Sequence, residues 1–178
     1  MKLSKNFSLD ELIRSNTAER RGIDNSPTAD HIHNLAALCE NILQPLRDRV
    51  KHSIRVTSGY RSERLNTAIG GASRDGKPSS EHCYGKAADI KLVIDGKPSS
   101  EHCYGKAADI KLVIDGENRS EILYLAILEM GIPFRQMIWE FGTEETPSWV
   151  HISFNKDDNK RQTLRAYKEG TRTKYANI

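Results

Sequence analysis

Hydrophobic residues recur at helical spacing in several stretches of the chain. The longest stretch opens at Ser26, which is expected to cap a helix that has Pro27 at its first position. Pro45 lies within the same stretch and is expected to kink the helix or to end its first part. The apolar stripe of this helix consists of Ile32, Leu35, Leu38, Ile42, Leu43 and Leu46. Shorter helices are predicted for the segments 8–12, 63–71 and 119–131.

Three further segments have the pattern of apolar and polar residues that is typical of β-strands. The first is SIRVTSGYRS at 53–62, and the other two are QMIWEF at 136–141 and WVHISF at 149–154. The polar loop GTEETPS joins the last two, which we interpret as a hairpin. This combination of elements indicates an α+β fold, in which helices pack against a central antiparallel sheet.

A segment of 20 residues occurs twice in immediate succession. The sequence DGKPSSEHCYGKAADIKLVI spans 75–94 and is repeated without change at 95–114. Solenoid repeats diverge and need at least three copies to stack, so an identical pair indicates a tandem duplication. We expect one copy to be native and the other to be a surplus insertion, because loop-closure entropy grows only slowly with length. The chain is expected to be a monomer, although the extra β-prone segment could also produce a swapped dimer.

The composition limits the classes of protein to which the chain could belong. The 178 residues suffice for a single domain, the net charge is +3, and no apolar run approaches the ~20 residues that a membrane-spanning helix needs. The first residues lack the apolar stretch of a secretory signal, so the protein is expected to be cytoplasmic as synthesised. Residues 155–178 form a basic tail, which alone gives little reason to expect binding to nucleic acid.

Candidate metal ligands occur in the duplicated block and in the last predicted strand. His82 and Asp89 are seven residues apart, and Gly85 between them permits a turn that folds His82 back over the strand carrying Asp89. In WVHISF, alternation places His151 on the face opposite the apolar residues. Each signal is weak alone, because a lone histidine in a strand is more often structural. Two imidazoles and one carboxylate, with water in the fourth position, make a catalytic zinc site.

Four motifs in a fixed order, SGYRS, GG, SxHxxGxAxD and WVHIS, resemble those of the zinc D-alanyl-D-alanine carboxypeptidases and the related phage cell-wall endopeptidases. The resemblance covers roughly 5–155, and the segments NFSLDELIRS and NLAALCENILQPLRDRV look like the short phage and prophage members. The vancomycin-resistance D,D-dipeptidases belong to the same superfamily, which shares its fold with the hedgehog signalling domain. The resemblance therefore implies this fold, a bound Zn²⁺ and hydrolysis of peptidoglycan stem peptides, with the wall reached after release or in a virion.

Carried over residue by residue, the resemblance implies that His82, Asp89 and His151 are the zinc ligands. If the second copy of the block is native, His102 and Asp109 would take the place of the first two. We expect the first copy to supply the ligands, because the surplus residues then follow the strand and lie away from the metal-binding turn.

Two further residues match substrate-binding positions of the family. Arg61 in SGYR matches the arginine that holds the terminal carboxylate of the substrate, and an ion pair that anchors the strand end is the alternative. Ser80 matches the small polar residue ahead of the histidine, and a turn-capping hydroxyl is its alternative.

The resemblance does not directly identify the general base, which is the residue that would take the proton from the attacking water. Many relatives carry a glutamate three residues before the last histidine, and Ser148 occupies that position here. Glu140 is our candidate, because the short phage-type members look similar there and alternation along MIWEF turns it away from the apolar residues. A slip of one residue in the hairpin would reverse its direction. Glu144 and Glu145 in the loop are the fallbacks. The missing glutamate also leaves the alternative of a non-catalytic wall-binding or phage structural protein.

Overall fold

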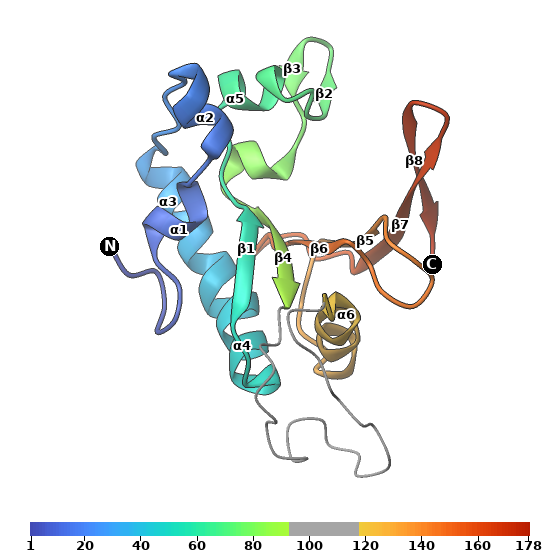
Figure 1. Cartoon of the computed structure of the whole chain (residues 1–178). Helices are drawn as coiled ribbons and strands as arrows, with labels where there is room; N and C mark the ends of the chain where they lie inside the picture. The colour runs from blue at the N-terminus through green and yellow to red at the C-terminus, as the bar shows by residue number, and fades with distance from the viewer. Residues whose placement is uncertain (93–117) are drawn as a thin grey trace.

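The computed structural model describes residues 1–92 and 118–178 (Figure 1). The second copy of the repeat, with His102 and Asp109, lies outside these residues. The helices are α1 (Leu9–Ile13), α2 (Asn16–Arg21), α3 (Ala29–Leu38), the π-helical turn η1 (Cys39–Leu43), α4 (Gln44–Val50), α5 (Glu63–Ala68), the 3₁₀ turn η2 (Glu81–Tyr84) and α6 (Ser120–Glu129). The strands are β1 (Ile54–Ser58), β2 (Ser73–Arg74), β3 (Lys77–Pro78), β4 (Ala87–Leu92), β5 (Gln136–Glu140), β6 (Trp149–Ser153), β7 (Gln162–Glu169) and β8 (Arg172–Asn177).

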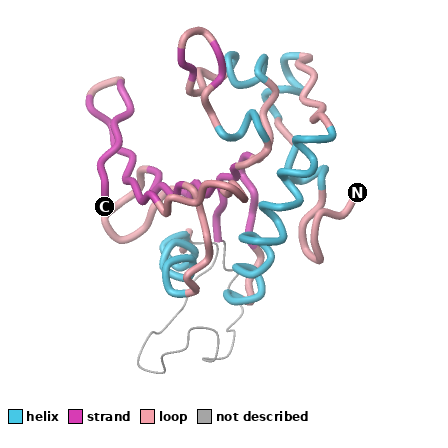
Figure 2. Tube along the Cα trace, turned by 180° about the vertical axis from the view of Figure 1, so that it is seen from behind, coloured by secondary structure: helices cyan, strands magenta, loops and turns pink. Residues whose placement is uncertain are grey.

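Six of the strands form one sheet in the order β1-β4-β6-β5-β7-β8. Neighbouring strands are antiparallel except for β5 and β7, which run parallel. The predicted α+β class and the predicted β5–β6 hairpin are therefore confirmed. In Figure 2 the β7–β8 hairpin and the segment with α5 and β2–β3 rise from opposite ends of the sheet, both away from α6.

One face of the sheet forms the core with the helices. Val150, Ile152 and Phe154 are buried there, as the alternation of WVHISF predicts. They pack in one cluster with Ile90 and Leu92 of β4 and with apolar residues of the helices, among them Leu35, Leu38, Ile42, Leu46, Leu123 and Ile127. The residues that alternate with them point to the opposite face, which is polar. Among the described residues, we find no helix with the length and apolarity that a membrane crossing requires.

The start of the long helix differs from the prediction. Its N-cap is Thr28, whose hydroxyl accepts a hydrogen bond from the backbone N–H of His31, while Ser26 instead donates its own N–H to Asp24. Pro45 lies in the first turn of α4, directly after η1. The wider π turn accommodates a residue that has no N–H to donate, so the helical path continues with a local irregularity.

The expectation that residues 155–178 form a tail was wrong. Residues 162–177 form β7 and β8, which add two strands to the sheet through the parallel pairing of β7 with β5. Ala166 is the buried residue of β7, and β8 has none, so the hydrophobic pattern gave little indication of a hairpin. The sequence feature that could have indicated the hairpin was Gly170. It has a φ of 61° and lies in the two-residue turn between the paired residues Glu169 and Arg172.

Candidate metal centre

The sheet register brings two of the predicted ligands together. Asp89 of β4 lies directly opposite His151 of β6, and residues paired in this way point to the same face of the sheet. His82 lies in η2, just before β4, and the chain reverses at Gly85 with a φ of 68°. A Cβ at Gly85 would also lie 2.5 Å from the backbone oxygen of His31, so glycine is required on both counts.

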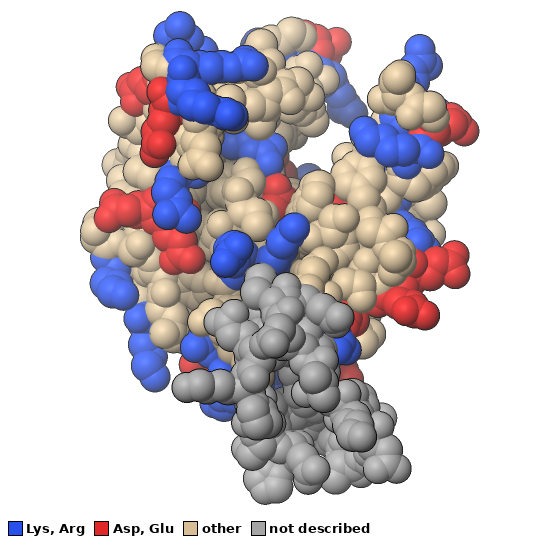
Figure 3. Space-filling view, viewed as in Figure 1, with Lys and Arg blue, Asp and Glu red and all other residues tan. Residues whose placement is uncertain are grey.

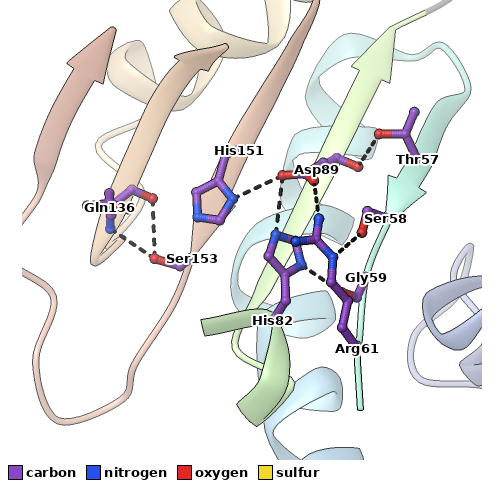
Figure 4. A network of polar contacts seen from close by, with 9 residues as sticks. All are labelled: Thr57, Ser58, Gly59, Arg61, His82, Asp89, Gln136, His151 and Ser153. Carbon is purple, nitrogen blue, oxygen red and sulfur yellow. Dashed lines mark hydrogen bonds and ion pairs between the residues drawn. The ribbon is translucent and has the colours of Figure 1, made fainter. Parts of the chain in front are cut away.

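The three side chains form a compact buried group (Figure 4). Asp89 Oδ1 lies 3.0 Å from His151 Nδ1 and 3.4 Å from His82 Nε2, and the candidate ligand atoms are all within 4.8 Å of one another. Donors bound tetrahedrally at zinc–nitrogen distances of about 2.0–2.1 Å are separated by about 3.3 Å. The spacing and the nitrogen and oxygen chemistry of the group therefore fit a zinc ion.

The other ring nitrogen of His82 orients this ligand. Nδ1 lies 2.6 Å from the carbonyl oxygen of Gly59, to which its N–H can donate. With the proton on Nδ1, the lone pair of Nε2 points toward Asp89. A carbonyl that fixes the tautomer in this way is a common outer-shell partner of metal-binding histidines.

The charge states of the group also suit a cation. Burial is the main reason that the pKa of His82 is lowered, so this imidazole is neutral at pH 7. Burial alone would raise the pKa of Asp89, but the adjacent side chains of His82 and His151 hold it well below its usual range. The site therefore presents a buried carboxylate next to the neutral imidazole of His82.

Arg61 contacts the outer oxygen of the same carboxylate. Its Nη2 donates to Asp89 Oδ2 at 2.9 Å, and its Nε donates to Ser58 Oγ at 2.9 Å. The backbone N–H of Arg61 also donates to the carbonyl oxygen of His82, at 3.2 Å. The ion pair that was the alternative role of Arg61 is thus present, and it leaves Asp89 Oδ1 directed at the two imidazoles.

Ser80 and the loop glutamates contribute less. The backbone carbonyl of Ser80 accepts a hydrogen bond from Cys83, but its side chain makes no capping hydrogen bond to η2. Glu144 and Glu145 are exposed in the loop between β5 and β6, where Glu144 forms an ion pair with Arg165.

Glu140 lies on the polar face of the sheet, as predicted. In the hairpin register Ile138 is opposite His151 and Glu140 is opposite Trp149, so Glu140 and His151 are diagonal neighbours on one face. The residue is 8% exposed, and burial, with a further contribution from Asp89, raises its pKa to about 7. Ser148 is adjacent, because its backbone N–H donates to the carbonyl oxygen of Glu140 at 2.9 Å.

Several supporting residues were not predicted. Gly59 and Ser58 hold His82 and Arg61, and the hydroxyl of Thr57 donates to the backbone oxygen of Asp89. All three lie in the strand segment that contains SGYR, so their closeness to Arg61 in the sequence could have indicated a supporting role. Ser153, two residues after His151, exchanges hydrogen bonds with the backbone of Gln136 and helps to fix the β5–β6 register.

Comparison with known proteins agrees with this geometry. A family model described as Peptidase M15 matches residues 5–97, which is more than half of the chain. The matched part contains Arg61, His82 and Asp89, while Glu140 and His151 lie beyond it. A search of curated proteins gave no match. The extent of the family match, together with a buried His–Asp–His group that fits zinc, shows that the chain belongs to the peptidase M15 family.

Proposed function

We propose that this metallopeptidase hydrolyses peptide bonds in the stem peptides of peptidoglycan. The observation that carries the proposal is the convergence of His82, Asp89 and His151 beside a second buried carboxylate, Glu140. A wall-binding protein would have no need for a carboxylate with its pKa near 7 on the same face as a metal site.

The residues of the chain divide the chemistry between them. A bound zinc ion would supply a Lewis acid for the scissile carbonyl and would lower the pKa of a coordinated water. Glu140 would accept the proton released in the attack and return it to the leaving amine, a role suited to a group that titrates near neutral pH. Its position next to Ser148 supports this role, because position 148 is where many relatives carry their glutamate.

Arg61 bears on the kind of peptide bond that is cleaved. Its hydrogen bonds to Ser58 and Asp89 use two donors of the guanidinium group, and the remaining donors can still bind a free carboxylate. A carboxypeptidase that removes a terminal D-alanine and an endopeptidase that cuts cross-links are therefore both consistent with the site.

The proposal is tested by incubating zinc-loaded protein with purified peptidoglycan and with soluble stem peptides that end in D-Ala-D-Ala. We expect mass spectrometry to show either loss of terminal D-alanine or cleavage of cross-linked fragments, and both should stop when a chelator removes the metal. If protein with verified zinc content binds the wall but cleaves neither substrate, the non-catalytic alternative is correct.

A pair of substitutions assigns the native copy of the repeat. Deletion cannot do so, because removing 75–94 or 95–114 yields the same sequence. We expect His82→Ala to abolish zinc binding and His102→Ala to preserve it, since His82 already completes a metal site with Asp89 and His151. Elemental analysis of the two dialysed proteins measures the difference. The reverse result would make the second copy native, and zinc retained by both variants would mean that the copies replace each other.

A further inference from the structure

The β7–β8 hairpin adds a wall to the polar face on which the metal centre lies. It follows the part of the chain that matches the peptidase family, and it joins the sheet through the pairing of β7 with β5, the strand that carries Glu140. In Figure 2 the hairpin rises from one end of the sheet, while α5 and β2–β3 rise at the other. The surface is notched between these two parts in Figure 3.

The register shows which side chain of the hairpin faces the site. Glu140 pairs with Ala166 of β7, and Ala166 pairs with Tyr175 of β8. Residues paired across neighbouring strands share a face, so Tyr175 lies on the same side of the sheet as Glu140 and in the same row. Tyr167 pairs with Lys174 and alternates with Ala166, so it lies on the other side.

Tyr175 also interacts electrostatically with the centre. Its pKa is raised by burial and by the negative charges of Glu140 and Asp89. Asp89 is on β4, four strands away in the sheet order, and the hairpin rises at the other end of the sheet (Figure 2). The phenol stays protonated at neutral pH and is available as a hydrogen-bond donor.

The ring of Tyr175 is nevertheless open to solvent. The residue is 54% exposed, which leaves a surface on which a ligand can pack. A tyrosine that combines an exposed ring with a protonated hydroxyl is suited to holding a peptide, with the ring against an apolar part and the hydroxyl toward a carbonyl oxygen.

We propose that Tyr175 is a substrate-binding residue, and that the β7–β8 hairpin is the wall of the groove in which the peptide lies. The phenol donates a hydrogen bond to a backbone carbonyl of the bound stem peptide, on the side of Glu140 away from the metal ligands. This inference rests on the proposed peptidase function for the identity of the peptide. It assigns substrate recognition to a segment beyond the matched region of the family.

Three variants of the hairpin tyrosines test the inference. We expect Tyr175→Phe to raise KM by about 2- to 10-fold, as the loss of one hydrogen bond predicts, with kcat and zinc content close to those of the parent. Tyr175→Ala should raise KM further because the ring is lost as well. Tyr167→Phe changes the same hairpin on its opposite face and should leave KM unchanged. Unchanged KM in both Tyr175 variants, or equal effects of the two phenylalanine variants with a lowered Tm, would overturn the inference.

A binding measurement separates this inference from the proposed function. The Kd of a D-Ala-D-Ala stem peptide is measured by calorimetry in a Glu140→Gln background, with and without Tyr175→Phe. A weaker Kd with Tyr175→Phe supports the role of Tyr175 even if the parent protein hydrolyses nothing, in which case only the proposed function fails. Hydrolysis by the parent, with a Kd and a KM that do not depend on Tyr175, refutes the inference and leaves the function intact.

Discussion

Replacing His151 with alanine is expected to remove the bound metal and, with it, the peptidase activity. His151 supplies one of the three protein donors, and its Nδ1 lies 3.0 Å from Asp89 Oδ1 in a buried group. With one nitrogen lost, the two donors that remain cannot make a three-ligand zinc site of the catalytic type. We expect about one zinc per chain in the dialysed parent and almost none in the variant, with hydrolysis reduced by more than about 100-fold.

The matched control is His33→Ala, which removes an exposed imidazole from helix α3. It should retain both the zinc and the activity of the parent. If zinc supplied during folding does not remain with the parent, the metal-centre assignment is wrong and the protein would have to act by another route. Zinc that stays bound in His151→Ala but is lost in His82→Ala would instead show that a different third ligand completes the site.

The polar face of the sheet could be predicted because one side of each central strand is buried. In WVHISF the apolar residues Val150 and Ile152 must face the core, and this requirement alone directs His151 to the other side. The same reasoning placed Glu140 on the polar face, and the β5–β6 register confirms that prediction. Gly85 was informative for a different reason, since only a residue that tolerates a positive φ allows the reversal that brings His82 over β4.

Other features could not be read from the pattern because they depend on contacts between distant segments. The choice between two roles for Arg61 depended on where its side chain points, and its hydrogen bond to Asp89 spans 28 positions of the sequence. The β7–β8 hairpin was missed because pairing with β5, rather than burial of its own side chains, holds it in the sheet. Tyr175 was missed with it, since a residue in an unrecognised strand cannot be assigned to a face.

Replacing Glu140 with glutamine is expected to abolish hydrolysis while leaving zinc binding intact. The amide keeps the size of the side chain but cannot accept the proton, so the rate should fall by about 10²- to 10⁴-fold. In the parent, activity should decline as the pH falls and Glu140 becomes protonated, with a midpoint near or below pH 7, because a bound cation can only lower the pKa further. The control is Glu145→Gln, which alters an exposed loop carboxylate.

The same substitution should make the metal-free protein more stable, which a structural role for Glu140 would not predict. Burial raises the pKa of Glu140 from 4.5 to about 7, so the folded state holds the proton more tightly than the unfolded state. The free energy of unfolding of the parent therefore decreases as the pH rises from about 4.5 to 7, by up to about 3 kcal/mol. Glutamine has no charge to bury, so we expect the variant to gain most of this difference at pH 8 and little at pH 4 in chemical denaturation. If the variant is instead less stable at pH 8, Glu140 supports the fold through contacts that glutamine cannot make, and its loss of activity would not identify the base.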